Sequence, residues 1–229
     1  MKNTVTSILV LFFLFLNACD TTVPKENTQD KPAEEKSAIN RGITQSDKKT
    51  IVFFGNSLSA AYGIDPSQGF VGLIAQRIDS LALPYQIVNA GLSGETTAGG
   101  KTRIEWILRQ PVDIFILELG GNDALRGIDP EESYSNLKFI IEKVKEKYPQ
   151  AKIILAGMEA PPNMGPEFTS KFRQMYPKLA KEYNASLIPF LLEGVGGDPK
   201  LNLPDGIHPT PAGHRIVAEN IWMILKDML

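Results

Sequence analysis

The sequence predicts an α/β protein in three layers, with a parallel sheet of about five strands between two layers of helices. Short aliphatic and aromatic runs, each ended by Gly, Asn or Pro, alternate with longer segments in which apolar residues recur at helical spacing. The alternation is regular, and strand–helix–strand units of this kind form parallel sheets with right-handed crossovers. We therefore expect an α/β/α sandwich.

Each element follows from this alternation. The expected strands are Ile51–Phe54, Tyr85–Asn89, Ile114–Leu119, Lys152–Ala156 and Ser186–Pro189. The expected helices are Phe70–Ala82, Thr102–Arg109, Pro130–Tyr148, Glu167–Tyr183 and Pro211–Met228. The last helix has Thr210 as its N-cap and Pro211 at its first position, where proline is favoured. Together these elements predict one domain over residues 50–229.

Residues 1–18 have the features of a secretory signal peptide. Lys2 gives a positive start, an apolar run covers residues 5–16, and Ala18 is a small residue before a cleavage point. The run is shorter than the roughly 20 residues that a membrane span needs. A short anchor that is never removed is the alternative.

Cys19 is the single cysteine of the chain, which excludes an intramolecular disulfide and cysteine ligation of zinc. The segment Leu16–Cys19 resembles the lipobox of bacterial lipoproteins. This resemblance implies that Cys19 is lipidated and would explain a free thiol in an exported protein. We expect an exported bacterial lipoprotein, anchored to a membrane and facing the periplasm or the cell surface.

Residues 20–49 are polar and have hardly any large apolar side chain, so they cannot bury enough surface to order themselves. We expect residues 19–49 to form the lipidated cysteine and a disordered tether, with a root-mean-square span of about 30 Å. The formal net charge of −2, and the lack of a basic, aromatic-rich pattern, argue against nucleic acid as a partner.

Candidate catalytic residues lie in turns that follow the expected strands. Ser57 comes directly after the first strand, and Asp205 precedes His208 by three residues in a turn that contains glycine and proline. A hydroxyl, an imidazole and a carboxylate are the groups that acyl transfer needs. Alone, such a serine is more often a helix cap or a phosphate-loop residue than a nucleophile, and an Asp-x-x-His turn is more often a local hydrogen-bonded loop than a catalytic pair.

Four segments in order resemble the four sequence blocks of the SGNH (GDSL-type) hydrolases: Gly55–Gly63, Asn89–Thr97, Gly120–Asp123 and Asp205–Pro209. The similarity is to the branch of thioesterase I/lysophospholipase L1 and the bacterial arylesterases, and it spans residues 51–229. It implies a flavodoxin-like α/β/α fold.

The resemblance also implies roles for individual residues. Ser57 would be the nucleophile, His208 the general base and Asp205 the residue that orients it. The oxyanion hole would comprise the backbone N–H groups of Ser57 and Gly94 and the side-chain amide of Asn122. The family usually has Asp where this chain has Asn56, which puts in doubt the rigidity of the Ser57 turn and the rate.

We therefore expect a serine esterase that hydrolyses acyl esters or thioesters, including lysophospholipids, through an acyl-enzyme, acting as a monomer without metal or organic cofactor. A carbohydrate esterase that removes acetyl groups from polysaccharide or peptidoglycan is one alternative. A non-catalytic lipoprotein that binds lipids or glycans is another. A phosphate-binding role is disfavoured because Gly55–Ser59 lacks the Gly-Lys-Ser/Thr ending of a P-loop.

Four further expectations concern single side chains and one loop. His214 is expected at the surface or as a helix cap, and Trp106 and Trp222 in the core. Asp123 is expected to brace its own turn. The proline-rich segment 161–166 is expected to wall an acyl groove with Met158, Met164 and Phe168, or to be a plain structural turn.

Overall fold

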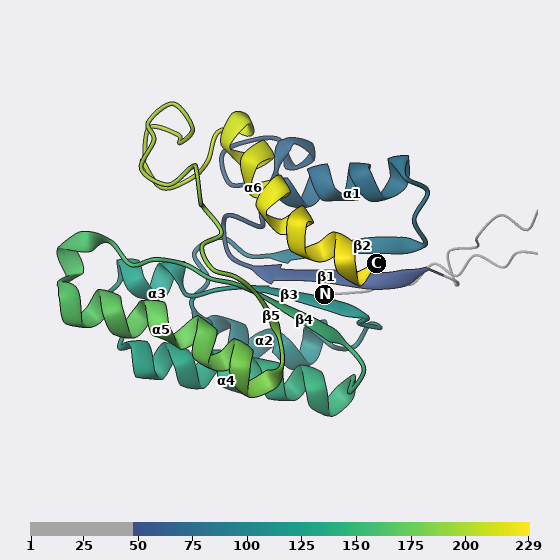
Figure 1. Cartoon of the computed structure of the whole chain (residues 1–229), viewed down its shortest axis with the longest axis horizontal. Helices are drawn as coiled ribbons and strands as arrows, with labels where there is room; N and C mark the ends of the chain where they lie inside the picture. The colour runs from purple at the N-terminus through teal and green to yellow at the C-terminus, as the bar shows by residue number, and fades with distance from the viewer. Residues whose placement is uncertain (1–47) are drawn as a thin grey trace, which may run out of the picture. The chain divides into compact units, whose positions relative to one another are not determined.

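A computed structural model describes residues 48–229 (Figure 1). The predicted signal peptide, Cys19 and most of the predicted tether lie outside the described residues. Within the described part, no helix is both long and apolar enough to cross a membrane.

The strands are β1 (Lys49–Gly55), β2 (Tyr85–Gly91), β3 (Ile114–Glu118), β4 (Lys152–Ala156) and β5 (Ser186–Ile188). The α-helices are α1 (Phe70–Ser80), α2 (Thr97–Ile107), α3 (Gly121–Leu125), α4 (Pro130–Lys147), α5 (Pro166–Tyr183) and α6 (Pro211–Leu225). Short 3-10 helices lie at Pro66–Gln68, Pro162–Met164 and Lys226–Met228.

The five strands form one parallel sheet in the order β2-β1-β3-β4-β5. Figure 1 shows α1 and α6 on one face of the sheet and α2, α4 and α5 on the other. The predicted α/β/α sandwich is confirmed, and the strand order is that of flavodoxin-like folds. In such sheets ligands bind beyond the carboxyl ends of the strands, where the chain reverses its direction of winding. Here that point lies between β1 and β3.

The register of the sheet brings distant turns together. Gly55, the last residue of β1, is paired with Gly91 at the end of β2 and with Glu118 at the end of β3. The three following segments therefore leave the sheet side by side. This alignment gathers the first three candidate motifs at one edge.

The central strands β1, β3 and β4 are buried on both faces of the sheet, which matches their continuous apolar runs. Residues 50–55 of β1 and all of β3 are buried. Helix α4 covers the sheet with Leu137, Ile140, Ile141 and Val144, spaced as one helical face requires and each at most 1% exposed. Burying each such side chain contributes about 1.5–3 kcal/mol relative to leaving it in water. This packing gives that edge of the sheet a rigid base.

Helix α2 begins at Thr97, five residues before the expected start at Thr102. Thr96 is its N-cap and accepts a hydrogen bond from the Gly99 N–H at 3.3 Å. Gly100 lies in the first turn of this helix and is packed closely, because a Cβ there would lie 2.4 Å from Leu119 Cδ1. Close contact between helix and sheet, rather than chain reversal, explains this glycine.

The expectations for the tryptophans and for His214 need correction. Trp106 is 65% exposed, because it lies on the face of α2 opposite the buried Ile104, while Trp222 is only partly buried. His214 is 1% exposed, and its Nδ1 accepts the backbone N–H of Phe70, the first residue of α1, at 3.2 Å. It therefore caps a neighbouring helix from the interior. Burial lowers the pKa of His214 to about 4.

Candidate active site

The loop before α6 holds Asp205 and His208 together through its own backbone. Asp205 Oδ1 accepts the backbone N–H groups of Ile207 at 2.9 Å and His208 at 3.0 Å, and Oδ2 lies 2.7 Å from His208 Nδ1. Gly206, at φ 72°, makes the turn that points the carboxylate back at these donors. The backbone donors, with the imidazole, lower the pKa of Asp205 to about 2.

His208 also reaches the residue after β1. Its Nε2 lies 2.8 Å from Ser57 Oγ, across 151 residues of sequence. An ionised carboxylate can only accept hydrogen bonds, so the neutral ring carries its proton on Nδ1 and presents Nε2 as an acceptor. The Ser57 hydroxyl then donates to Nε2. The structure thus brings Ser57, His208 and Asp205 into one hydrogen-bonded chain.

The three predicted oxyanion donors come from the Ser57 turn, the loop after β2 and helix α3. Within residues 48–229, neither the Ser57 N–H nor the Gly94 N–H donates to a backbone carbonyl. Asn122 Nδ2 donates to the Glu95 carbonyl at 2.9 Å, which uses one of its two amide hydrogens and leaves the other free. Gly94 has φ 80°, a conformation that favours glycine.

Hydrogen bonds lock the Gly94 loop to α3. Besides the bond from Asn122, Arg126 Nη2 donates to the Gly94 carbonyl at 3.0 Å. The fully buried Asp123 accepts both the N–H and, at 2.6 Å, the hydroxyl of Thr97 at the start of α2. Asp123 was expected to brace its own turn, and it instead joins α3 to α2. The Gly94 loop and Asn122 on α3 are therefore held in a fixed relation to each other.

A buried carboxyl that the sequence analysis did not single out lies beneath Ser57. Glu118 Oε2 accepts the Asn56 N–H at 3.0 Å, the Ser59 N–H at 3.3 Å and the Ser59 hydroxyl at 2.8 Å. Its Oε1 has no hydrogen-bond partner among the described residues. Burial raises the pKa of Glu118 to about 7. The sequence offers one sign of this residue, because Glu118 is a charged side chain within the apolar run of β3.

Asn56 keeps the turn intact. It is 2% exposed, and its Oδ1 accepts the Leu58 N–H at 2.9 Å, a bond that an aspartate oxygen could equally accept. Its backbone N–H is the one bound by Glu118. Asn56 therefore keeps a side-chain oxygen that accepts the Leu58 N–H, as the aspartate usual in the family could do.

A cavity of about 500 Å³ opens beside these groups. Ser57, Asn122 and His208 line it, and its apolar wall includes Leu125, Met158, Pro161, Pro162, Phe190 and Leu192. The proline-rich segment thus walls the cavity as expected, together with Met158. Met164 and Phe168, the other expected wall residues, are not among the lining residues; Phe168 stacks on Phe172 with ring centroids 6.2 Å apart. Gly94 and Asp205 do not line the cavity either.

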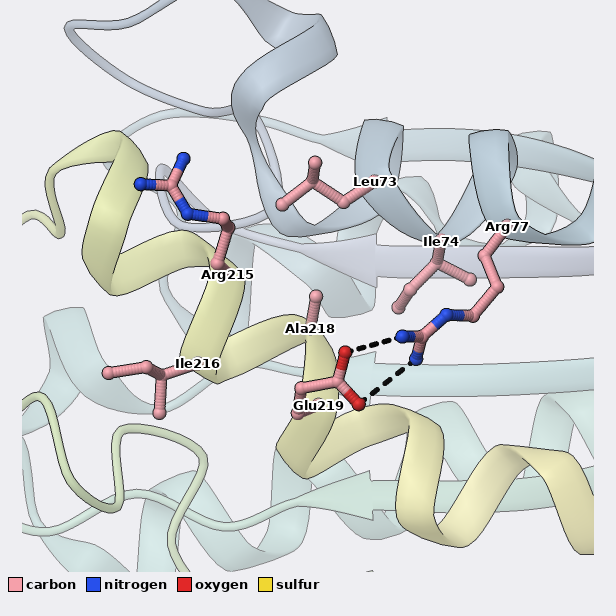
Figure 2. Close-up of a pocket in the computed structure, with 7 residues that line it drawn as sticks. All are labelled: Leu73, Ile74, Arg77, Arg215, Ile216, Ala218 and Glu219. Atoms are coloured by element: carbon pink, nitrogen blue, oxygen red, sulfur yellow. Dashed lines mark hydrogen bonds and ion pairs between the residues drawn. The ribbon is translucent and has the colours of Figure 1, made fainter.

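A second hollow, of about 360 Å³, lies between α1 and α6 (Figure 2). The guanidinium of Arg77 forms a two-pronged ion pair with Glu219 across it, at 3.0 and 2.5 Å. Half-exposed pairs of this kind contribute at most about 1 kcal/mol. The carboxylate that lines this hollow, Glu219, is paired with Arg77, and the other lining residues are Arg215 and the aliphatic side chains of α1 and α6.

Known proteins resemble this chain over most of its length. It is 39% identical to esterase TesA of Pseudomonas aeruginosa over 186 residues, covering 81% of this chain and 92% of TesA. It is 35% identical to thioesterase 1/protease 1/lysophospholipase L1 of Escherichia coli K12 over 175 residues, covering 76% of this chain and 81% of that protein. The structure of AlinE4, described as an SGNH-hydrolase family esterase, superposes with a TM-score of 0.66 at 37% identity, covering 81% of this chain and all of AlinE4.

The family model described as GDSL-like lipase/acylhydrolase matches residues 53–216. This range contains the Ser57 turn, the Gly94 loop, α3 and the Asp205–His208 loop, which are the segments that the fold gathers at one sheet edge. The chain therefore belongs to the GDSL-like lipase/acylhydrolase family, the SGNH hydrolases, whose members hydrolyse ester bonds.

Proposed function

We propose that the protein is a serine esterase that hydrolyses acyl esters or thioesters through an acyl-enzyme, with Ser57 as the nucleophile, His208 as the base and Asp205 as its orienting carboxylate. The observation that carries this proposal is the hydrogen-bonded chain from Asp205 through His208 to Ser57, which opens into an apolar cavity. A nucleophile, a base and a group that orients the base are the parts that acyl transfer requires.

In the first half of the reaction, His208 Nε2 takes the proton of Ser57 Oγ as that oxygen attacks the substrate carbonyl. The carbonyl oxygen becomes negative and is stabilised by the Ser57 N–H, the Gly94 N–H and the free amide hydrogen of Asn122. His208 then gives its proton to the departing alcohol or thiol as the bond to the carbonyl carbon breaks. Ser57 is left as an ester.

In the second half, water replaces the alcohol. His208 removes a proton from water, the hydroxide attacks the Ser57 ester, and the same donors stabilise the second oxyanion. Collapse returns the proton to Ser57 Oγ and releases the carboxylic acid. Asp205 stays ionised throughout, because its pKa is held at about 2.

The cavity wall favours an acyl chain over a sugar. Met158, Pro161, Phe190 and Leu192 present aliphatic, aromatic and proline surface beside Ser57. A chain of methylene groups gains about 0.8 kcal/mol for each CH₂ that such a wall removes from water. Relatives named esterase, thioesterase and lysophospholipase act on substrates with acyl groups, and their names agree with this assignment. Acetylated polysaccharide is the weaker alternative because it offers little apolar surface to bury.

The test is Ser57→Ala in the full chain, assayed on p-nitrophenyl esters of increasing acyl length, on a lysophospholipid and on acetylated xylan. We expect kcat to fall more than about 1,000-fold. Wild-type protein should react with a phosphonate ester at one site, and the variant should not. Ser135→Ala, on the exposed side of α4, is the matched control and should keep full activity. Activity that survives Ser57→Ala, or a preference for xylan over every acyl ester, contradicts the proposal.

Lipidation at Cys19, export and a monomeric state stay predictions. The lipobox-like segment Leu16–Cys19 and the polar composition of residues 20–49 support the first two. An anchored enzyme of this kind would meet acyl substrates at or near a membrane.

A further inference from the structure

Tyr62 lies against the imidazole of His208 without lining the cavity. The two ring centroids are 4.6 Å apart with 39° between the ring planes. Tyr62 is nevertheless 52% exposed, and it is not among the residues that line the acyl cavity. A large aromatic side chain that is this open to water therefore still packs against the imidazole of His208.

The Ser57 turn itself holds Tyr62 in this position. The Tyr62 N–H donates to the Ser57 carbonyl at 3.0 Å, and the Ala61 N–H donates to the Leu58 carbonyl at 3.2 Å. These two bonds, with Ala61 at φ 57°, form a Schellman motif that ends a single helical turn. Glycine normally takes the position of Ala61, and alanine there is strained by about 1–2 kcal/mol. Such strain persists where the surrounding structure fixes it, often at functional sites.

We propose that Tyr62 is a positioning residue for His208, and that its ring face stabilises the imidazolium formed when His208 takes the Ser57 proton. The proposal rests on the proposed function. The proton moves from Ser57 Oγ to His208 Nε2, the oxygen's electron pair forms the bond to the carbonyl carbon, and the ring becomes positive. A cation over the face of a tyrosine is attracted by the negative potential of that face. The neutral ring gains less from the same contact.

The other ionisable groups around His208 do different work. Asp205 bonds to Nδ1 and supplies the main attraction for the positive ring. His214 lies in the first turn of α6, and its lowered pKa of about 4 leaves it neutral where the enzyme works. Glu159 lines the cavity but pairs with Arg173 at 3.1 Å. The Tyr62 contribution therefore adds to that of Asp205 and can be separated from it by substitution.

The experiment compares Tyr62→Leu with Tyr62→Phe and follows kcat/KM for a p-nitrophenyl ester as a function of pH. Leucine keeps apolar cover but has no π face, so we expect the pKa of the acidic limb to fall by about half a unit. We expect the plateau of kcat/KM to fall about two- to fivefold. Phenylalanine keeps the ring face and should restore both values. Trp106→Leu, which removes another exposed aromatic ring, is the matched control and should change neither.

A second readout does not need turnover. The chain has only two histidines, so the imidazole C–H resonances in an NMR titration belong to His208 and His214. In a Ser57→Ala background, the pKa of His208 should fall by about half a unit in Tyr62→Leu, and that of His214 should stay constant.

An unchanged His208 pKa in Tyr62→Leu overturns the inference. So does a rise in KM confined to aryl esters with no pKa change, which would make Tyr62 part of a surface for the leaving group. These outcomes are distinct from failure of the proposed function, in which the wild-type protein would not react with the phosphonate and Ser57→Ala would change nothing.

Discussion

Two carboxyl groups flank the Ser57 turn, and they are held in opposite ways. The Asp205 side chain is 37% exposed, whereas Glu118 is 1% exposed. Asp205 accepts two backbone N–H groups and the imidazole, which lower its pKa to about 2. Glu118 also accepts three donors, yet its complete burial outweighs them and raises its pKa to about 7. Similar numbers of hydrogen bonds thus accompany opposite pKa shifts, because Asp205 is exposed to solvent and Glu118 is not.

The difference separates two tasks. In the proposed mechanism Asp205 must remain charged while a proton moves between Ser57 and His208, and it lies where water and backbone dipoles stabilise the charge. Glu118 holds the backbone of Asn56 and Ser59 and takes part in no proton transfer of the mechanism. Gly55 shows how tightly it is packed, because a Cβ there would lie 2.4 Å from Glu118 Oε2. A buried group of this kind fixes the geometry of the turn, but it also makes the stability of the protein depend on pH.

The largest expected effect comes from removing the exposed carboxylate, Asp205. Asp205→Ala removes the group that fixes the His208 tautomer and stabilises its charged form, so we expect kcat to fall about 10³- to 10⁴-fold. Ester hydrolysis measured from pH 6 to 9 gives the size of the loss. Asp79→Ala, at an exposed position of α1, should leave kcat unchanged. A loss below tenfold would mean that the backbone alone orients the imidazole.

The buried carboxyl should instead change how stability depends on pH. Below about pH 4.5, Glu118 is protonated in both the folded and the unfolded chain. Between about pH 4.5 and 7 the unfolded chain loses this proton while the folded one keeps it, so stability falls as pH rises. A shift of this size corresponds to about 3 kcal/mol, fully lost above pH 7.

Glu118→Gln removes this titration. The substitution also costs stability at every pH, because it places an amide group where Oε1 has no hydrogen-bond partner. This constant cost cancels when the free energy of unfolding in urea is compared between pH 5 and pH 8. We expect the variant to gain about 3 kcal/mol relative to wild type over that interval. Glu193→Gln, an exposed glutamate, should follow the wild-type pH dependence. Parallel stability curves for wild type and Glu118→Gln would show that Glu118 is already ionised at pH 5.

The sequence indicated the exposed carboxylate, Asp205, but did not single out the buried one, Glu118. Ser57, Asp205 and His208 lie in turns whose residue types are dictated by chemistry and by local backbone geometry, and such patterns are visible in one dimension. Glu118 is recognisable only as a charge within the apolar run of β3. Its partners at Asn56 and Ser59 follow from the pairing of β1 with β3, which a single sequence does not reveal.

The same reason explains the errors in the fold. The strands were predicted from apolar runs, but the start of α2 at Thr97 was missed, and Gly100 in its first turn packs against Leu119. His214 was expected at the surface or as a helix cap, and its burial could not be predicted because its hydrogen bond is to Phe70, 144 residues away. Features fixed by local geometry were predictable, and features fixed by packing between distant segments were not.

The smallest effect is expected where the chain departs from its family. Asn56→Asp restores the usual residue, and an aspartate oxygen can accept the Leu58 N–H as the amide oxygen does. The turn should therefore persist, and kcat/KM at pH 8 should change less than about threefold, which is about 0.6 kcal/mol. Asn56→Ala, which leaves the Leu58 N–H without this acceptor, is the comparison and should cost about 1–3 kcal/mol of stability.

The new carboxylate of Asn56→Asp should still shift the pKa of Glu118. A negative charge at position 56 opposes ionisation of Glu118, so the pH range in which Glu118 loses its proton should move upward, toward pH 8. Urea unfolding of Asn56→Asp at pH 5, 7 and 9 tests this directly. If the pH dependence matched that of wild type while kcat/KM fell as far as in Asn56→Ala, the two positions would not interact. The amide would then be needed for its N–H₂ group, and the asparagine would be a requirement of this turn.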